Sequence, residues 1–253
     1  MSVAAGTLAP EAIRPHLRGR FGDPYRFEPE CESTQSLLLG ADLPEGAVAA
    51  TDHQTAGRGR LGRTWVAPAG SSVLASVLLH PPAERQWPEL ALVGGVAAAD
   101  AIEAATDLSA QVKWPNDVML DRRKVAGVLA EARDASVVLG IGINVNQTRS
   151  ELPLDAPTEP GSLRTVTGST YDVAELLGSL LLRLERLYDA WREGGLSEIY
   201  VDLGSRNFLF GRRVLVDGRD GIGGVIGRDG RLEVHVGHGE TISVESGEVE
   251  YVR

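Results

Sequence analysis

A loop-forming segment at residues 54–65 carries three arginines and three glycines within seven residues and ends on a tryptophan. The arginines are Arg58, Arg60 and Arg63, and the tryptophan is Trp65. Arginine presents a planar fork of donors that suits phosphate and carboxylate oxygens, and glycine lets a backbone come close to a ligand. We therefore predict a mobile, cationic loop that closes over an anionic ligand.

The same residues fit two other patterns. Residues 57–62 match the dinucleotide fingerprint G-x-G-x-x-G, which requires a helix to begin at the last glycine. Val66 and Pro68 follow closely and oppose such a helix, so this interpretation is rejected. An arginine-glycine segment that binds RNA would repeat, whereas this one occurs once between two apolar runs. A solvated basic loop stays open as the plain alternative until other motifs are added.

Four further segments combine residues that are unusual for their expected structure. Residues 113–117 read Lys-Trp-Pro-Asn-Asp at a strand end, and a turn explains only the last three. Residues 124–131 begin with a lysine on an apolar strand, for which an exposed strand end is the ordinary explanation. Residues 140–146 insert two glycines and two asparagines into a strand, which indicates either close approach of a ligand or a β-bulge. Residues 31–35 form a helix cap whose hydroxyls could also line a pocket.

The chain as a whole is acidic. Its 253 residues include 35 aspartates and glutamates against 25 lysines and arginines, a net charge of −10. This balance argues against general binding to nucleic acid or anionic membranes, so the basic loop is a local device. The lone Cys31 excludes an intramolecular disulfide framework, and the absence of a leader or long apolar span favours the cytoplasm. The histidines show no metal-ligand spacing, so no structural metal is expected.

Periodicity and turn residues predict the elements that position these segments. Strands are expected at residues 47–50, 72–79, 110–114, 124–132 and 137–145. The last three are joined by turns so short that they must pair antiparallel. A short helix is expected after Ser33, and a longer one over residues 90–105.

A second set of elements is expected in the C-terminal half. The clearest helix begins at Asp172, with Glu175 completing a capping box, and ends at Gly194 and Gly195. Beyond Gly204, short β-prone pieces alternate with glycine and aspartate turns, at residues 213–216, 224–226, 232–236, 241–244 and 248–252. This tail is typical of a small separate β-barrel. The predicted parts are an N-terminal extension over 1–20, a main domain over 21–206 and the barrel over 207–253.

In chain order, the chemical segments resemble the successive signatures of the biotin protein ligase family, at residues 32–35, 54–65, 113–117, 124–131 and 140–144. The resemblance implies an α+β fold with a mixed, largely antiparallel sheet flanked by helices, similar to class II aminoacyl-tRNA synthetases, followed by a small SH3-like β-barrel. Residues 21–206 would then be the catalytic domain that binds biotin and ATP. Some members carry an N-terminal DNA-binding domain, but here the serine–threonine signature begins at residue 33. We therefore expect the monofunctional form, with no DNA partner.

The resemblance also implies a two-step reaction. The biotin carboxylate attacks the α-phosphate of ATP, giving biotinyl-5′-AMP and pyrophosphate, and a lysine of a biotin carboxyl carrier domain then attacks this mixed anhydride. The first step brings a carboxylate to a polyphosphate, so cations are needed near the reacting atoms. Mg²⁺ would help to supply that positive charge, together with Arg58, Arg60, Arg63 and Lys124.

Site residues are carried over in the same way. The biotin site would comprise Ser33, Thr34, Gln54, Gly57, Arg58, Arg60, Lys124, Gly127 and Gly142. The nucleotide site would comprise Arg60, Arg63, Trp65, Lys113, Asn116 and Asn144, with Trp65 beside the adenine. The catalytic residues would be Lys124, Arg58, Arg60 and Asp117. In this assignment Lys124 meets the biotin carboxyl and then the α-phosphate, while Asp117 lies near the Mg²⁺ site and could orient the acceptor lysine.

Two rival functions stay open on the sequence. A lipoate or octanoate ligase shares the fold and the acyl-adenylate chemistry, although the arginine loop and the Lys-Trp-Pro-Asn-Asp block favour biotin. A nucleic-acid-binding module could use the arginines and the barrel, but the acidic balance opposes it. The sequence does not choose the acceptor carboxylase, nor between a monomer and a homodimer. An exposed sheet edge could pair two subunits or align the carrier domain.

Overall fold

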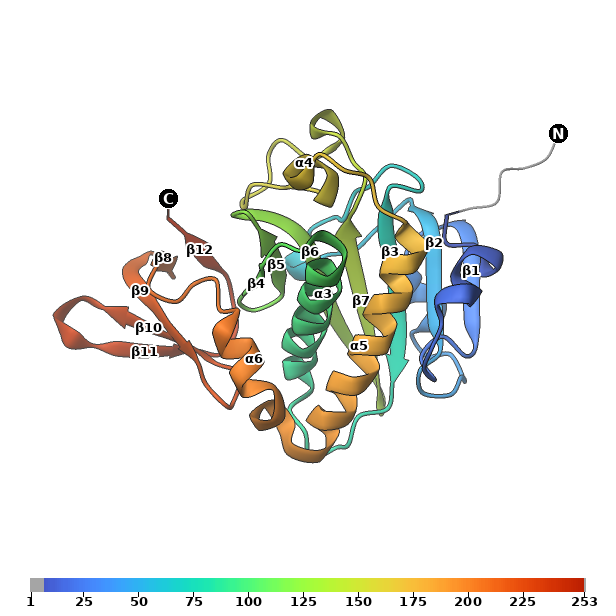
Figure 1. Cartoon of the computed structure of the whole chain (residues 1–253). Coiled ribbons are helices and arrows are strands. Elements are labelled where there is room, and N and C mark those ends of the chain that lie inside the picture. Colours follow the sequence, from blue (N-terminus) through green and yellow to red (C-terminus); the bar gives the residue numbers. More distant parts are fainter. Residues whose placement is uncertain (1–6, 253) are drawn as a thin grey trace.

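The structure is a computed structural model in which residues 7–252 are described. Its main element is a seven-stranded sheet in the order β1-β2-β3-β7-β6-β5-β4 (Figure 1). β1 pairs parallel with β2 and every other neighbouring pair is antiparallel, which confirms the mixed, largely antiparallel sheet. Its strands are β1 (Tyr25–Cys31), β2 (Val48–Gln54), β3 (Ser72–Leu79), β4 (Ala110–Lys113), β5 (Asp117–Leu120), β6 (Arg123–Arg133) and β7 (Ser136–Asn144).

Two of these strands, β1 and β5, were not predicted. β1 is an edge strand that carries Pro29 and several charged residues, so it shows neither apolar alternation nor a full set of ladder donors. β5 has only four residues and lies directly between two turns, which is too short for any periodicity to be recognised. β1 is polar because it lies at an edge of the sheet, whereas β5 is short although Val118, Met119 and Leu120 are buried in the core.

Two long helices, α3 (Leu90–Thr106) and α5 (Val173–Gly194), cover one face of this sheet (Figure 1). α3 packs closely on the sheet at Gly94, because a Cβ there would lie 2.9 Å from a methyl carbon of Val128 and 3.1 Å from one of Leu139. Asp172 caps α5 by accepting backbone hydrogen bonds at 2.8 and 3.0 Å. The shorter helices are α1 (Pro10–Ile13), α2 (Thr34–Leu38), α4 (Leu163–Thr167) and α6 (Tyr200–Ser205).

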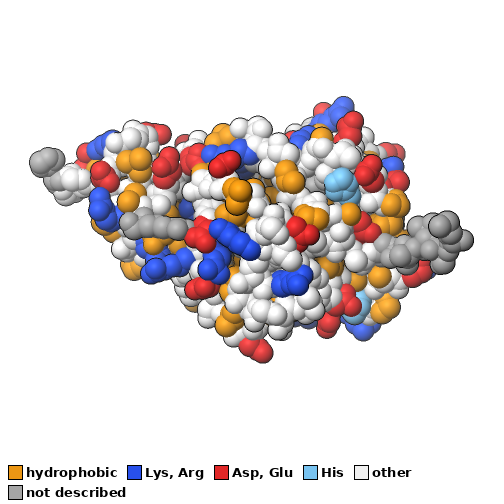
Figure 2. All heavy atoms as spheres, turned by 90° about the horizontal axis from the view of Figure 1, so that it is seen from above, with side chains coloured by type: hydrophobic (Ala, Val, Ile, Leu, Met, Phe, Trp, Pro, Cys, Tyr) orange, Lys and Arg blue, Asp and Glu red, His pale blue; other side chains and the backbone are white. Residues whose placement is uncertain are grey.

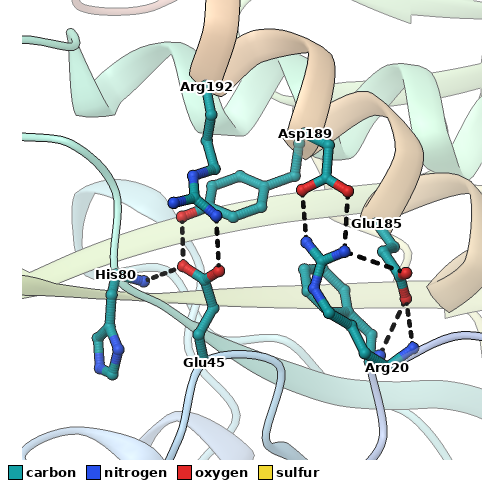
Figure 3. A network of polar contacts seen from close by, with 8 residues as sticks. Arg20, Glu45, His80, Glu185, Asp189 and Arg192 are labelled. Atoms are coloured by element: carbon teal, nitrogen blue, oxygen red, sulfur yellow. Dashed lines mark hydrogen bonds and ion pairs between the residues drawn. The ribbon is translucent and has the colours of Figure 1, made fainter.

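Figure 3 shows polar contacts that hold α5 to the chain around it. Glu45, in the loop before β2, accepts hydrogen bonds from the Tyr188 hydroxyl at 2.8 Å and from Arg192 at 3.0 Å. Arg20, which precedes β1, pairs with Glu185 at 3.2 Å. These bonds join α5 to the two segments that precede β1 and β2.

A second, five-stranded antiparallel sheet follows in the order β11-β10-β9-β8-β12. This confirms a small β unit of the SH3-like kind, and each of its strands was predicted, although β9 begins five residues earlier than expected, at Arg219 instead of residue 224. The strands are β8 (Arg213–Val216), β9 (Arg219–Ile226), β10 (Leu232–Val236), β11 (Thr241–Val244) and β12 (Val249–Tyr251).

The three predicted parts of the chain are packed together. Leu8 and Ile13, from the predicted N-terminal extension, are fully buried in the same core as the sheet. Phe208 joins the edge strand β4 through a backbone bond of 2.9 Å to Val112. The Trp114 indole N–H donates to the Gly230 carbonyl at 2.9 Å. Within residues 7–252, no helix is both long and apolar enough to cross a membrane.

Replacing Trp114 by alanine is expected to lower the free energy of unfolding by about 3–5 kcal/mol, because the ring is a large, nearly fully buried side chain that joins the two sheets. Urea denaturation monitored by circular dichroism measures this loss. Trp87 is a matched control, since it is only half-buried, and Trp87→Ala is expected to cost clearly less. Equal losses in the two variants would show that Trp114 does not couple the sheets.

Candidate active site

A cavity of about 650 Å³ opens on the sheet face opposite α3 and α5. The face is identified by side-chain alternation, because Val128 and Leu139 contact α3 while Gly127 and Gly140 point the other way. The cavity is lined by α2, the arginine loop with Gln54, strands β3, β6 and β7, residues 113–117 between β4 and β5, the loop at residues 153–160, and residues 247–249 of the C-terminal unit. The cavity therefore gathers every segment that the sequence singled out.

The strand register divides the cavity floor into two levels. Ser76 of β3 lies opposite Gly140 of β7, which lies opposite Leu129 of β6. Two residues further along β7, Gly142 lies between Leu74 and Gly127. Since Gly127 pairs in turn with Asp117 of β5, the second level leads to the charged residues. This unbroken register also excludes a β-bulge at residues 140–144, one of the two predicted alternatives.

Uncharged hydrogen-bonding groups gather at the first level. The Thr34 backbone N–H donates to Gln54 Oε1 at 2.9 Å, and the Thr34 and Ser76 hydroxyls are 2.7 Å apart. Gln35 donates to the Leu129 carbonyl at 3.0 Å, while its own Oε1 is buried without a hydrogen-bond partner. Ser33 is buried at the N-cap position of α2, with no side-chain hydrogen bond to the helix. The structure thus brings Ser33, Thr34 and Gln54 together as predicted.

Trp65 covers the second level. A Cβ on Gly142 would lie 2.6 Å from Trp65 Cε2, and one on Gly127 would lie 3.0 Å from Cζ3. The Trp65 ring thus packs directly on both glycines, and a side chain at Gly142 would force it to move. The Trp65 indole nitrogen is itself buried without a hydrogen-bond partner. The middle of the cavity, where the Trp65 ring lies against Gly127 and Gly142, is called the apolar passage below.

Cations and a carboxylate gather beyond the tryptophan. Lys124 Nζ lies 2.6 Å from Asp117 Oδ1 and 5.8 Å from the centre of the Trp65 ring. The Lys113 ammonium donates to Thr158 Oγ1 at 3.3 Å, and Arg60 donates to Asn116 Oδ1 at 3.4 Å.

Burial changes the pKa values of two cations at the charged end of the cavity. Loss of hydration lowers the pKa of Lys113 and that of Arg60, although nearby carboxylates act in the opposite direction. A cation that is poorly hydrated in the empty cavity gains more from an arriving anion than a fully solvated one does. The charged end is therefore suited to carboxylate and phosphate groups.

The backbone of Lys124 is fixed by the loop at residues 153–160. Its N–H donates to the Glu159 carbonyl at 2.8 Å, and its carbonyl accepts from Gly161 at 2.9 Å. Asn144 is also tied to this region, since its side chain donates to the Gly161 carbonyl and accepts from Gln147, both at 2.9 Å. Asn144 lines the cavity, but its amide is already engaged in these bonds.

The three loop arginines do not converge on one point. Arg60 reaches Asn116, whereas Arg58 binds Glu131 of β6 at 3.0 Å and Arg63 binds Glu248 of the C-terminal unit at 2.6 Å. Backbone bonds from Trp65 to Gly57 and from Gly59 to Arg63, at 2.9 and 2.8 Å, close the loop into a hairpin. Two of its three arginines are thus paired with carboxylates, and the mobility of the loop and its closure over an anion stay predictions.

Several cavity residues were missed from the sequence. Gln35 sits within the serine–threonine motif and could have been included on that ground. Thr158 lies in a polar loop that carries no recognisable motif, and neither does the apolar strand that holds Ser76, which binds Thr34 without lining the cavity. Glu248 lies in the tail, where only β-prone periodicity was noted.

The tether between Arg63 and Glu248 gives a pH-dependent prediction. Hydrogen bonds from Arg63 hold the pKa of Glu248 below the usual value of about 4.3. A depressed pKa stabilises the folded state above the unfolded-state value, and this contribution is lost as pH falls through the folded value. The tether is therefore expected to persist at neutral pH and to be released only in acid.

Carbon-13 NMR titration of the Glu248 carboxyl measures this shift directly. In an Arg63→Ala variant the midpoint is expected to rise toward the usual glutamate value. The same midpoint in both proteins would contradict the tether.

Known proteins are similar to this chain both in sequence and in structure. Residues 29–147 match the model of the biotin/lipoate A/B protein ligase family. The biotin--[acetyl-CoA-carboxylase] ligase of Mycobacterium tuberculosis is 37% identical over 239 residues, covering 87% of this chain and 86% of that protein. The bifunctional ligase/repressor BirA of Bacillus subtilis is 35% identical over 204 residues, covering 77% of this chain. The chain spans 63% of the length of that relative.

Solved structures agree with the sequence relatives. The biotin protein ligase from Aquifex aeolicus in complex with biotin and ATP superposes with a TM-score of 0.81 at 31% identity, covering 90% of this chain and 98% of that one. The agreement extends over both sheets, because a coverage of 90% cannot be reached without the C-terminal unit. By sequence and by structure, this chain belongs to the biotin protein ligase family.

Proposed function

We propose that this protein is an ATP-dependent biotin protein ligase that forms biotinyl-5′-AMP and transfers biotin to a lysine of a biotin carboxyl carrier domain. One observation carries the proposal: the order of groups along the cavity. Neutral hydrogen-bonding groups at Thr34 and Gln54 are followed by the apolar passage at Trp65 and by cations at Lys124 and Lys113. Biotin presents a ureido ring, an apolar valeryl chain and a carboxylate in the same order.

In the first step, Lys124 and Arg60 would neutralise the charge that accumulates as the carboxylate approaches the α-phosphate. Lys124 is suited to this because its backbone is bonded to the loop at residues 153–160 and its ammonium is held by Asp117. The anion would then replace Asp117 as the partner of a lysine that is already in place. Positioning of this kind lowers the barrier without reorganisation during the reaction.

The nucleotide would extend beyond Lys124, toward Lys113, Asn116, Arg63 and Asn144. No cluster of three or more histidine, cysteine, aspartate or glutamate side chains among residues 7–252 could hold a metal ion. Mg²⁺ commonly binds through one or two carboxylates together with phosphates and water. Asp117 therefore fits an Mg²⁺ ion delivered with ATP, where the ion would neutralise phosphate charge, and does not form a metal site by itself.

In the second step, Asp117 would orient the acceptor lysine of the carrier domain. The support is its geometry with Lys124, which shows that this carboxylate can hold a lysine ammonium at 2.6 Å inside the cavity. We place this reaction in the cytoplasm, as the single cysteine also suggests.

Two alternatives receive less support. Lipoate and octanoate have no ureido ring, so they would add no hydrogen bonds at the neutral end, where the buried Gln35 Oε1 would stay without a partner, which costs binding energy. A nucleic-acid-binding module would need a continuous basic surface. Figure 2 shows lysine and arginine side chains interspersed with acidic ones on the visible face.

Labelling of a carrier domain tests the proposal. The protein, biotin and MgATP are incubated with a biotin carboxyl carrier domain, and the product is analysed by intact-protein mass spectrometry. One biotin on the carrier lysine is expected, with none when ATP is omitted or when that lysine is replaced by arginine. No biotin on the carrier, or transfer of lipoate or octanoate when either replaces biotin in the mixture, would overturn the assignment.

A further inference from the structure

The first arginine of the loop, Arg58, binds two elements of the main domain at once. One guanidinium nitrogen donates to Glu131 Oε1 of β6 at 3.0 Å, and the other donates to Ser36 Oγ of α2 at 2.8 Å. Glu131 does not line the 650 Å³ cavity, so it lies outside the residues that would contact a substrate there. Its second carboxylate oxygen is buried without a hydrogen-bond partner. Arg58 is therefore the cation on which this half-buried carboxylate depends.

We propose that Glu131 is a positioning residue which, together with Ser36, uses Arg58 to fix the start of the arginine loop at the neutral end of the cavity. The inference takes biotin as the ligand, and in this respect it rests on the proposed function. It assigns the Arg58 side chain to anchoring, in contrast to the charge-neutralising role expected from the sequence. Arg60 and Lys124 retain that second role.

Gly57, the residue before Arg58, lies close to both Trp65 and Gln54. A Cβ on Gly57 would lie 2.3 Å from the Trp65 carbonyl oxygen and 2.9 Å from Gln54 Nε2. Gly57 thus lies between the Trp65 backbone, which carries the ring over the cavity, and the side-chain amide of Gln54, whose oxygen accepts from Thr34. A displacement of Arg58 would move both groups relative to each other.

Ser36, the second residue that Arg58 binds, lies on α2, which also supplies Thr34 and Gln35 to the cavity. Ser36 follows Gln35 directly on α2, and Thr34 begins that helix. The bond from Arg58 to Ser36 therefore joins the loop to the segment that carries the neutral end. Loss of Glu131 would loosen this junction without removing any group from the cavity lining.

Because the Arg58–Glu131 ion pair is partly exposed to solvent, its loss is expected to change stability and biotin binding only modestly. The side chains of Arg58 and Glu131 are 37% and 28% exposed, so their ion pair contributes little to global stability. Glu131→Ala is expected to leave the melting temperature nearly unchanged and to weaken biotin binding about 3- to 10-fold, the range that one solvent-screened pair supports. The adenylation rate at saturating biotin and ATP is expected to stay within about twofold of wild type, because Glu131 lies outside the cavity lining.

Hydrogen exchange of the amides at residues 57–63 provides a readout that needs no substrate. Faster exchange is expected in both Glu131→Ala and Arg58→Ala, and the double variant should exchange no faster than Arg58→Ala, because the two residues act as one unit. Glu131→Gln retains an acceptor for Arg58 and should recover most of the protection. Asp134→Asn is the matched control, since this residue follows β6, loses the same charge, has a side chain that is 91% exposed and holds a φ of 53° that asparagine tolerates.

The outcomes separate the anchor from its alternatives. Unchanged exchange in Glu131→Ala, or additive effects of the two substitutions, would overturn the proposal. A fall in the saturated adenylation rate of Glu131→Ala by about a hundredfold would also overturn it, since this is the loss expected of a group that stabilises the reaction itself. Coupled exchange in a protein that shows no affinity for biotin would support the anchor while refuting the proposed function.

Discussion

Adenylate formation is expected to slow by about 10²–10³-fold when Lys124 is replaced by alanine, the loss seen when one preorganised charge donor is removed. The Lys124 ammonium is held 2.6 Å from Asp117 at the end of the apolar passage. In the proposed function this ammonium neutralises charge between the biotin carboxylate and the α-phosphate of ATP. Biotin affinity should fall far less, because the polar groups around Thr34 and Gln54 are unchanged. Single-turnover adenylation, measured at saturating biotin and ATP, determines the rate.

Two controls separate the role of Lys124 from side effects. Arg123 is the neighbouring cation on β6 but does not line the cavity, so Arg123→Ala is expected to change the rate by no more than a few-fold. Lys124→Ala also removes the ion-pair partner of Asp117, and Asp117→Asn, which removes the same pair together with the proposed Mg²⁺ contact, sets an upper limit on the contribution of the pair. Adenylation at wild-type speed in Lys124→Ala would exclude the proposed role.

Release of the reactive adenylate is expected to increase about tenfold or more when Arg60 is replaced by glycine, because a loop that closes over an intermediate keeps it from solvent. Arg60 is half-buried and, among the loop arginines, is the one that binds the Lys-Trp-Pro-Asn-Asp block, through Asn116. Its replacement removes donors and adds backbone freedom. Escaped biotinyl-5′-AMP would then acylate exposed lysines without selectivity.

The measurement is biotin incorporation into an unrelated protein such as albumin, mixed with the variant, biotin and MgATP. Arg60→Lys retains the positive charge without the planar fork and is expected to leak less than Arg60→Gly. Albumin labelling by Arg60→Gly at the wild-type level would show that Arg60 does not retain the intermediate.

Local sequence patterns predicted those parts of the molecule that depend on neighbouring residues. The capped helix at Asp172, the strand at Ser72–Leu79 and the short turns between strands all follow from periodicity and turn chemistry. The close grouping of Ser33, Thr34 and Gln54 was expected only from the family resemblance. A motif places its members on one segment, whereas a site is assembled from segments that meet in space.

Long-range pairing explains most of what the sequence did not show. Arg58 and Glu131 are separated by 73 residues, and Arg63 and Glu248 by 185. No local period connects such partners, so all three arginines were assigned to the ligand. The glycines at 127 and 142 were likewise expected to approach biotin, whereas in this structure the Trp65 ring approaches them.

Pyrophosphate exchange into ATP tests most directly whether the order of groups in this cavity selects biotin for activation. The protein is incubated with MgATP and labelled pyrophosphate, and biotin, lipoate, octanoate or RNA is the only further addition. We expect exchange with biotin alone, because only biotin satisfies the neutral end at Thr34 and Gln54 while placing a carboxylate at Lys124. Equal exchange with lipoate or octanoate, or no exchange with biotin, would contradict this.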